Sequence, residues 1–460
     1  MTISLVLPNA LDAEMSQLTT LSVESGGVLL CRLVKDGADF RLLGREFVPV
    51  PEGAYVVRES DSLRVTSDGY VPALGKAETD GALPVWVHTH PTAGCSPRPS
   101  RYDDVVDGQL TDPFRLRSGS EFYGSLILNR ADRGLGFTGF IESEGSRASI
   151  DRILTVGSRI RLMWSFDAEQ PPVAAQFDRN VRAFGGDVQR VLSDLRVAIV
   201  GCGGTGSAVA EQLGRLGVRR FLLVDPESLS ESNVTRVYGS GAFDVGVPKT
   251  DVAKANIQRV APDAMVECVN AMVTNETVAR RLSGVDVVFG CTDDNAGRLV
   301  LSRVATFLLI PVIDSGVLLT SDDDGELNGI FGRVTVLTPG SACLVCRGRV
   351  DLARAGTEML NPDERERRVD EGYAPALGGA EPAVVAYTTA VAAAAVAELL
   401  ERLVGYGGDA IVPNEILLRI HDRESSGNHQ SPTEGHYCDL AAGKIGRGIT
   451  EPFLEQTWQS

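Results

Sequence analysis

The 460-residue sequence lacks a basic excess, a long apolar run and a dense cysteine pattern. Its formal charge of −17 disfavours the phosphate backbone of a nucleic acid as a partner. The most apolar stretch, residues 383–403, is alanine-rich but contains Glu398, Glu401 and Arg402. It predicts a buried or subunit-interface helix rather than a membrane span, so no membrane partner is expected.

Secretion is also not indicated. No basic segment precedes an apolar one at the start of the sequence, so no signal peptide is expected. Eight cysteines are scattered over the chain, which is not the pattern of a disulfide-stabilised scaffold. We therefore expect a reduced, cytoplasmic protein. The length and the 43% apolar content predict a globular chain of two or three domains.

A glycine-rich turn follows an apolar run near the middle of the sequence. The run ends at Val200 and has the length of a buried parallel strand. A helix should follow through Leu216, and a second strand over 220–224 then delivers Asp225, nineteen residues after Gly206. Such a turn at a helix N-terminus binds phosphates, and an acid at this distance can reach ribose hydroxyls. The spacing predicts a nucleotide site.

Two chemistries fit this nucleotide site. An NAD-dependent oxidoreductase needs the glycine turn and the ribose acid, and the sequence has both. The residues after the acid favour cleavage of a triphosphate, because Asn233, Arg236 and Lys249 follow it. The amide of Asn233 can donate hydrogen bonds, and the fixed cations Arg236 and Lys249 can meet the charge that develops on the phosphates.

The runs GCGGTGS, DPESLSESNVTR, VPK and GCTDDNAGR resemble the adenylating domain of the ThiF/MoeB/HesA family, the prokaryotic relatives of ubiquitin-activating enzymes. The resemblance covers roughly residues 178–438. It implies that the C-terminal carboxylate of a small ubiquitin-like or sulfur-carrier protein ending in Gly-Gly is adenylated with ATP and Mg²⁺. The residues that it implies in nucleotide binding are Gly201, Gly203, Gly204, Gly206, Asp225, Asn233, Arg236, Lys249 and Asp293.

The same resemblance assigns further roles. Asp293 matches the family's magnesium-linked aspartate, and the adjacent Asp294 can exchange roles with it, since this chain has a doubled acid. Arg182 matches an arginine that reaches the phosphates in the partner subunit's site, which implies a homodimer. Arg182, Arg236, Lys249 and Asp293 are therefore the candidate catalytic residues of this domain.

A second group of chemistry-bearing residues lies in the N-terminal third. The apolar run over 85–87 leads directly into His88 and His90, and Pro91 ends the strand. At strand spacing both imidazoles point to one face, and Asp103 can return as a third ligand. Two nitrogens and one carboxylate oxygen suit Zn²⁺ and leave a position open for water. Paired histidines alone are equally compatible with an ordinary polar surface.

The order Glu, HxHP, SxxD resembles the JAMM (JAB/MPN) metalloprotease signature. The resemblance implies that Glu24 is the general base and acid and that Ser100 stabilises the oxyanion. The rival bases Glu46, Glu52 and Glu59 do not precede a Gly-Gly apolar strand. The loop between His90 and Ser100 is two residues longer than usual, so a non-catalytic docking module is an alternative.

The cysteines divide into one candidate metal site and several expected core residues. Cys343 and Cys346 resemble half of the zinc knuckle of ThiF relatives, with only Cys438 and His436 near the C-terminus to complete it. A Cys₃His site therefore competes with a lost site. Residues 347–379, where thioester-forming relatives carry a nucleophile, contain no cysteine. Small buried side chains are expected for Cys202, Cys268 and Cys291, so adenylation without an enzyme thioester is predicted.

Together these patterns predict an α/β protein with two domains. Residues 1–165 would form a JAMM (JAB/MPN)-like α+β domain with a mixed sheet, and 166–177 a linker that contains Pro171 and Pro172. Residues 178–460 would form a Rossmann-like, doubly wound ThiF/MoeB adenylation domain with a zinc-knuckle-like segment. The predicted function is carrier adenylation coupled to zinc-dependent trimming or deconjugation, in sulfur transfer or protein conjugation.

Overall fold

The structure is a computed structural model that divides into two compact units. The first unit comprises Met1–Gln170 with Gly446–Gly448, and the second comprises Pro171–Ile445 with Ile449–Ser460. The residues that the structure describes are 2–91, 97–131, 134–165, 172–322, 324–370, 383–408 and 412–458.

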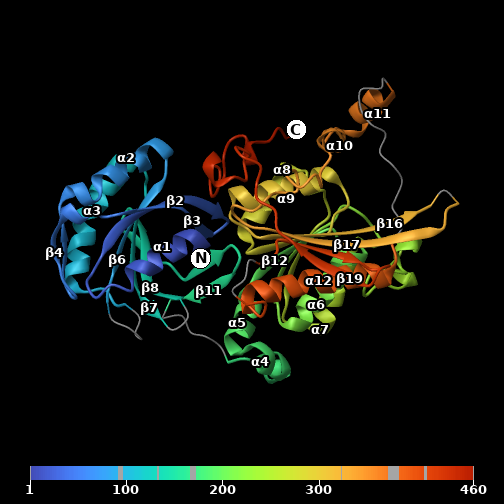
Figure 1. Ribbon diagram of the computed structural model, residues 1–460, viewed down its shortest axis with the longest axis horizontal. Coiled ribbons are helices and arrows are strands. Elements are labelled where there is room, and N and C mark those ends of the chain that lie inside the picture. The colour runs from blue at the N-terminus through green and yellow to red at the C-terminus, as the bar shows by residue number, and fades with distance from the viewer. Residues whose placement is uncertain are drawn as a thin grey trace. The chain divides into compact units, whose positions relative to one another are not determined.

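Among its described residues, the first unit contains a nine-stranded mixed sheet in the order β11-β10-β1-β3-β2-β6-β7-β8-β9 (Figure 1). A separate ribbon pairs β4 with β5. The strands are β1 (Ile3–Pro8), β2 (Gly26–Asp36), β3 (Asp39–Pro49), β4 (Tyr55–Arg58), β5 (Leu63–Val65), β6 (Leu83–Thr89), β7 (Tyr123–Ala131), β8 (Gly134–Ser143), β9 (Ser146–Ser149), β10 (Arg152–Val156) and β11 (Arg161–Trp164).

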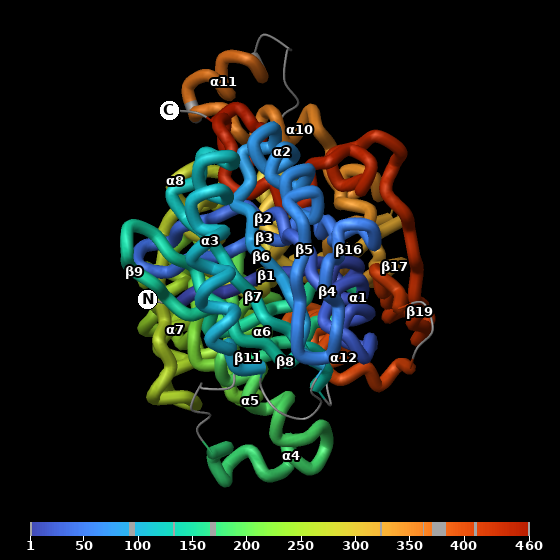
Figure 2. Tube along the Cα trace, turned by 90° about the vertical axis from the view of Figure 1, so that its left-hand side faces the viewer, coloured from blue at the N-terminus to red at the C-terminus, as the bar shows by residue number. Residues whose placement is uncertain are grey.

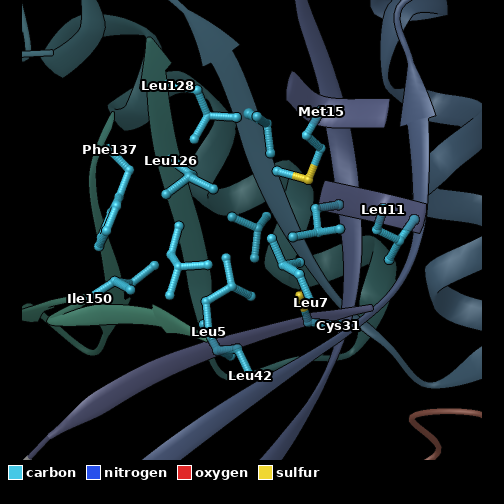
Figure 3. Close-up of a cluster of buried hydrophobic side chains, with 14 of the residues drawn as sticks. Leu5, Leu7, Leu11, Met15, Cys31, Leu42, Leu126, Leu128, Phe137 and Ile150 are labelled. Carbon is cyan, nitrogen blue, oxygen red and sulfur yellow. The ribbon is translucent and has the colours of Figure 1, made fainter. Parts of the chain in front are cut away.

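Helices cover both faces of this sheet. α1 (Asn9–Leu18) packs on one face, and α2 (Val71–Asp80) and α3 (Arg101–Ser118) lie side by side on the other (Figure 2). Because side chains alternate along β2, Leu29 and Cys31 join the core under α1, whereas Val28 and Leu30 join the core under α2 and α3. Figure 3 shows Met15 of α1 in the first of these clusters.

The second unit contains an eight-stranded sheet, among its described residues, in the order β14-β13-β12-β15-β16-β17-β18-β19. The strands from β14 to β16 are parallel, and β17, β18 and β19 add antiparallel pairs. The strands are β12 (Arg196–Val200), β13 (Arg220–Val224), β14 (Met265–Val269), β15 (Val287–Gly290), β16 (Val312–Ser321), β17 (Leu327–Leu337), β18 (Glu415–Arg419) and β19 (Glu424–Asn428).

The parallel part of this sheet has the Rossmann-like winding. The chain winds outward from β12 to β14 and then reverses to β15 and β16, so the switch point lies between β12 and β15. Figure 1 shows α6, α7 and α12 on one face and α8 and α9 on the other. The helices are α4 (Asp178–Phe184), α5 (Gly186–Asp194), α6 (Gly204–Leu216), α7 (Lys249–Val260), α8 (Glu276–Arg281), α9 (Asn295–Phe307), α10 (Leu352–Glu358), α11 (Pro362–Asp370) and α12 (Val385–Val404).

Several local predictions are confirmed. α6 ends at Leu216 as expected, β13 spans the predicted strand, and the alanine-rich stretch forms α12. The mixed α/β class with a Rossmann-like sheet is confirmed as well. In the part of the chain that the structure describes, no helix has the length and apolar character needed to cross a bilayer. Residues 166–171 of the predicted linker lie outside the described residues, and the functional division at 165 and 178 stays a prediction.

Candidate functional site

A cavity of about 740 Å³ opens in the second unit at the carboxyl ends of β12, β13 and β15. In an open parallel sheet this switch point is where ligands bind. Most of the predicted nucleotide residues line the cavity, and they are Gly201, Gly203, Gly204, Asp225, Asn233, Arg236, Lys249 and Asp293.

Two close backbone approaches shape the glycine-rich loop. Gly201 has a φ of +92°, and a Cβ there would lie 2.6 Å from the carbonyl oxygen of Cys291. A Cβ on Gly206 would lie 1.8 Å from the carbonyl oxygen of Gly201. Gly206 does not line the cavity, and its lack of a side chain lets the turn close against the backbone of Gly201. Gly203, in contrast, lines the cavity.

The acid at the end of β13 is tied to this loop. One carboxylate oxygen of Asp225 accepts the backbone N–H of Cys202 at 2.6 Å, and the other accepts that of Glu227 at 2.8 Å. Asp225 is buried. Burial raises its pKa, although the two backbone hydrogen bonds act in the opposite direction.

The two adjacent acids after β15 have different surroundings. Asp294 is the N-cap of α9, where its carboxylate accepts the N–H of Gly297 at 2.5 Å and the hydroxyl of Thr292. Burial raises the pKa of Asp294. Asp293 is exposed at the cavity, so only its neighbour is committed to the helix cap.

The predicted cations divide into those at the cavity and one outside it. Lys249 is buried at the start of α7 and forms an ion pair with Glu227. Arg236 is half-buried in the cavity wall. Arg182 lies on α4, where its side chain is 78% exposed and pairs with Asp178 at 2.9 Å. Arg182 does not line the cavity of its own chain.

In the first unit, the end of β6 gathers a candidate metal centre. Nε2 of His88 lies 3.1 Å from Oδ1 of Asp103, and Nε2 of His90 lies 3.5 Å from Oδ2 of the same carboxylate. The ligand atoms of the three residues all lie within 4.8 Å of one another. Two imidazoles and one carboxylate at this spacing can hold a divalent ion such as Zn²⁺.

The strand register brings Glu24 to this centre. β2 and β6 are antiparallel with Gly26 opposite His88, so residue 24 falls opposite residue 90 just beyond the paired segment. Oε1 of Glu24 lies 3.8 Å from Nε2 of His90. Burial raises the pKa of Glu24, and the nearby histidines offset part of this shift.

Hydrogen bonds fix the remaining groups of the centre. Burial alone would raise the pKa of Asp103, but the imidazoles of His88 and His90 beside its carboxylate outweigh this effect and hold that pKa well below its usual range. Ser100 is the N-cap of α3, where its hydroxyl oxygen accepts the N–H of Asp103 at 3.2 Å. The hydroxyl proton of Ser100 can still be donated to another acceptor.

The rival bases have other surroundings. Glu46 pairs with Lys76, Glu52 accepts a hydrogen bond from Arg58 at 2.7 Å, and Glu59 is exposed. Residues 92–96 of the lengthened loop before Ser100 lie outside the described residues. Of the candidate bases, the structure places Glu24 beside His90.

A second candidate metal centre lies in the second unit and consists of Cys343, Cys346, His436 and Cys438. The sulfur atoms of Cys346 and Cys438 are 3.7 Å apart, and Nδ1 of His436 lies 3.3 to 3.6 Å from the three sulfurs. Tetrahedral zinc, with Zn–S bonds of about 2.3 Å, gives S–S edges of about 3.8 Å and S–N edges of about 3.5 Å. The donor set and its geometry therefore fit a zinc ion.

The comparison with protein families decides the identity of the second unit. The model described as the ThiF family matches residues 177–432, more than half of the chain. The chain belongs to the ThiF family. The match contains the nucleotide cavity together with Cys343 and Cys346, whereas the histidine centre, His436 and Cys438 lie outside it.

Curated relatives of this ThiF-family chain include three enzymes with different names. It is 32% identical over 178 residues to the SAMP-activating enzyme E1 of Haloferax volcanii, covering 38% of this chain and 62% of that enzyme. It is 31% identical over 172 residues to molybdopterin-synthase adenylyltransferase of Escherichia coli, covering 37% of this chain and 65% of that enzyme. It is 36% identical over 141 residues to tRNA threonylcarbamoyladenosine dehydratase of Bacillus subtilis, covering 30% of this chain and 56% of that enzyme.

The chain thus spans less than two thirds of the length of each of these relatives. Among solved structures, that of E. coli MccB matches 58% of this chain and 73% of its own, at 17% identity and a TM-score of 0.45.

One expectation for the cysteines of this ThiF chain is only partly correct. Cys202 is buried as expected, but Cys268 and Cys291 are only partly buried. Cys268 lies on β14, at the edge of the sheet, and Cys291 follows β15 at the cavity wall, so neighbouring elements cover them less completely.

The sequence did not identify every residue of the cavity wall. Arg298, Ser315, Gly316 and Thr388 also line it. Arg298 belongs to the run GCTDDNAGR, so its position in that run was the available signal. The other three come from β16 and α12, where nothing in the local sequence marks a site.

Proposed function

We propose that this ThiF-family chain uses ATP and Mg²⁺ to adenylate the C-terminal carboxylate of a small ubiquitin-like or sulfur-carrier protein. The observation that supports this most directly is the convergence of Asp225, Asn233, Arg236, Lys249 and Asp293 on one cavity at the sheet's switch point. The names of two relatives, a SAMP-activating enzyme and a molybdopterin-synthase adenylyltransferase, agree with it.

Each residue then has a task that fits its position. Asp225 accepts the ribose hydroxyls, and the amides at the start of α6 face the phosphates together with Gly203 and Gly204. Asn233, Arg236 and Lys249 hold the phosphates. Asp293 is an exposed oxygen ligand at the cavity, of the kind that Mg²⁺ prefers. Magnesium, when bound, neutralises charge on the phosphate oxygens.

The reaction needs no proton transfer by the protein. One oxygen of the ionised carboxylate attacks the α-phosphorus in line. The bond from that phosphorus to the bridging oxygen breaks, and its electron pair leaves with pyrophosphate. The product is an acyl-adenylate, and the protein contributes position and neutralisation of charge.

The homodimer is part of this proposal. Arg182 is exposed and lies outside the cavity of its own chain, as expected of a group that serves the site of a second subunit. Because residues 347–379 contain no cysteine, the acyl group would pass to an external thiol, sulfide donor or amine. Sulfur transfer and protein conjugation both remain compatible with this step.

The test is ATP–pyrophosphate exchange with purified carriers that end in Gly-Gly. We expect exchange that requires a carrier, that Asp293→Ala abolishes and that the exposed control Asp422→Ala leaves intact. ATP, and not NAD, should raise the melting temperature. Absence of exchange with every carrier, or protection by NAD instead, would refute the proposal and favour an oxidoreductase.

We propose a second activity for the first unit, a zinc-dependent peptidase of the JAMM type. It is favoured by the 3.8 Å approach of Glu24 to His90 and by the ligand atoms of His88, His90 and Asp103 within 4.8 Å of one another. Zn²⁺, when bound there, polarises the scissile carbonyl and acidifies water. The substrate would be the same carrier, either extended beyond Gly-Gly or linked through an isopeptide bond.

The chain's own groups complete the hydrolysis. Glu24 takes a proton from the attacking water, whose oxygen bonds to the carbonyl carbon. The hydroxyl of Ser100 donates to the oxygen that becomes negative. The carbon–nitrogen bond then breaks, and Glu24 returns the proton to the leaving amine. The product carries the free carboxylate that the adenylation requires.

The matched test is cleavage of a carrier fused to a C-terminal tag. We expect cleavage by the wild-type protein and by the exposed control Glu59→Gln, and none by Glu24→Gln or after removal of zinc. Cleavage that survives Glu24→Gln would refute the assigned mechanism. An inactive wild-type unit that still binds the carrier would favour the docking module.

A further inference from the structure

The short helix α10, which has no role in the reaction described above, contacts the start of α9. The two helices pack against each other (Figure 1). At the start of α10, the backbone N–H of Asp351 donates to Oδ1 of Asn295 at 2.9 Å. At its end, Oε2 of Glu358 accepts the N–H of Ala296 at 2.8 Å. Both ends of α10 therefore bond to the first two residues of α9.

The carboxylate of Glu358 is held in one orientation. Its side chain is 9% exposed, and its Oε1 accepts hydrogen bonds from Nε of Arg354 at 3.1 Å and from Nδ2 of Asn295 at 3.4 Å. Its Oε2 serves Ala296, which is fully buried. Water does not reach a backbone group in such a place, so Glu358 supplies the acceptor that this N–H requires.

The first turn of α9 thus uses two carboxylates. A helix start leaves several backbone N–H groups without partners inside the helix. Asp294, the N-cap, accepts the N–H of Gly297, and Glu358 accepts that of Ala296. Both groups are satisfied without the carboxylate of Asp293, which is exposed at the nucleotide cavity.

The doubled acid gives α9 two possible caps. Asp294 caps the helix through Gly297, three residues further along the chain. Asp293 has the same spacing from Ala296, so it can accept that N–H in the same way. The positive end of the helix attracts either carboxylate. A cap made by Asp293 would turn its side chain away from the cavity and towards the helix.

We propose that Glu358 is a positioning residue for Mg²⁺: by occupying the N–H of Ala296, it prevents Asp293 from capping α9 and keeps that carboxylate at the cavity. The inference rests on the adenylation proposed above and on the place of Asp293 in it as the Mg²⁺ ligand. Without Glu358, the buried N–H of Ala296 loses its acceptor, which is costly, and Asp293 is drawn to it. Coordination of Mg²⁺ then competes with capping of the helix.

The same arrangement separates the two charged ends of the nucleotide. Among the described residues no side chain caps α6, whose N-cap is Gly203, so its amides can meet phosphate oxygens. At α9 the corresponding amides are occupied by carboxylates. Phosphates are therefore favoured at α6, and a cation is favoured at the carboxylate of Asp293 beside α9.

The test measures how Mg²⁺ changes the thermal protection by ATP. Melting temperatures of the full-length protein are recorded with ATP in EDTA and then at increasing Mg²⁺. Mg²⁺ should add to the protection of the wild-type protein by ATP. Glu358→Ala should keep the protection in EDTA and should require about tenfold or more Mg²⁺ for half of the added protection. Pyrophosphate exchange should show the same shift.

Two conservative variants separate the hydrogen bond from the charge. Glu358→Gln keeps an acceptor oxygen of equal reach without the charge, so it should resemble the wild-type protein. Glu358→Asp keeps the charge on a side chain too short to reach Ala296, so it should resemble Glu358→Ala.

Asp286→Ala is the matched control for stability. Asp286 is buried, and its carboxylate accepts the N–H of Arg196 at 3.0 Å, at the start of β12 and away from the cavity at the carboxyl end of that strand. Its removal should lower the melting temperature and leave the response to Mg²⁺ unchanged.

The outcomes separate this inference from the adenylation itself. An unchanged requirement for Mg²⁺ in Glu358→Ala and Glu358→Asp would overturn it, as would an equal shift in Glu358→Gln or in Asp286→Ala. If Glu358→Ala does not fold, Glu358→Asp against Glu358→Gln decides. A wild-type protein whose ATP protection does not respond to Mg²⁺ would also overturn the inference. The expected shifts without pyrophosphate exchange with any carrier would refute adenylation and retain the role of Glu358.

Discussion

The backbone N–H of Cys202 donates a 2.6 Å hydrogen bond to the carboxylate of Asp225, so the glycine-rich loop is fastened to the end of β13. The second carboxylate oxygen accepts the N–H of Glu227. The acid therefore serves the shape of the loop as well as the proposed ribose contact. Its ionisation should influence nucleotide binding in both ways.

ATP affinity should weaken in acid through Asp225. Burial raises its pKa, so it takes up a proton at a higher pH than an ordinary aspartate, and the neutral acid is a weaker acceptor for ribose hydroxyls. The affinity of Asp225→Asn for ATP at neutral pH should be lower than that of the wild-type protein by about tenfold or more. This affinity should also no longer depend on acid. ATP titrations from pH 4.5 to 7.5 measure this. An equal acid dependence in the variant would contradict the role of Asp225.

Two glycine substitutions in one loop should have different effects. A Cβ on Gly206 would overlap the carbonyl oxygen of Gly201, so Gly206→Ala should lower the melting temperature or prevent folding. No atom lies within 4 Å of a Cβ on Gly203, which lines the cavity, so Gly203→Ala should fold normally and bind ATP more weakly. Circular dichroism melts with and without ATP give both results. Equal destabilisation by the two changes would contradict this description of the loop.

The proposed trans arrangement of Arg182 can be tested by subunit mixing. Arg182→Ala and Lys249→Ala should each be inactive in pyrophosphate exchange. A heterodimer of the two variants contains one site with both residues intact, because its lysine and arginine come from different chains. Differently tagged, co-purified heterodimers should therefore recover about half of the wild-type activity. Absence of recovery would show that both residues act within one chain.

Metal analysis should distinguish the two candidate centres. The wild-type protein should contain two zinc ions per chain, and His90→Ala and Cys346→Ser should each contain one. Cys346→Ser should also lower the melting temperature by about 5–10 °C, since a closed Cys₃His site stabilises the fold. Cys268→Ser, outside the cluster, is the control. Two zinc ions per chain in either ligand variant would contradict the assignment of that centre.

Substitutions of the two adjacent acids after β15 should separate an effect on catalysis from an effect on stability. Asp293→Asn should keep the melting temperature and reduce exchange by about a hundredfold or more. Asp294→Ala removes the N-cap of α9 and should cost ~1 kcal/mol, whereas Asp294→Asn keeps an acceptor oxygen and should restore most of this loss. Denaturant unfolding and exchange assays measure both. Loss of exchange in Asp294→Asn, with Asp293→Asn active, would reverse the roles.

The sequence alone was sufficient for features that depend on neighbouring residues. The apolar run before Gly201 and the spacing to Asp225 predicted a strand, a turn, a helix and a second strand, all of which the structure contains. The alternation around His88 and His90 likewise placed two imidazoles on one face. These features follow from local backbone periodicity, which the order of residues encodes directly.

Only the tertiary structure decided the features that depend on register and packing. The pairing of β2 with β6 selects Glu24 over Glu46 and Glu52 as the neighbour of His90. Capping of α9 distinguishes Asp294 from Asp293, which adjacent positions in the sequence could not do.

Only Arg298 of the ion-paired cluster with Asp314 and Arg333 had a local signal, its place in the run GCTDDNAGR, because the three residues come from a helix and two strands. Their approach is fixed by the parallel pairing of β15 with β16 and the antiparallel pairing of β16 with β17. The sequence thus determined which elements form and where a nucleotide loop lies. The tertiary structure decided which charged side chains meet at its rim, since that depends on contacts between residues distant in the chain.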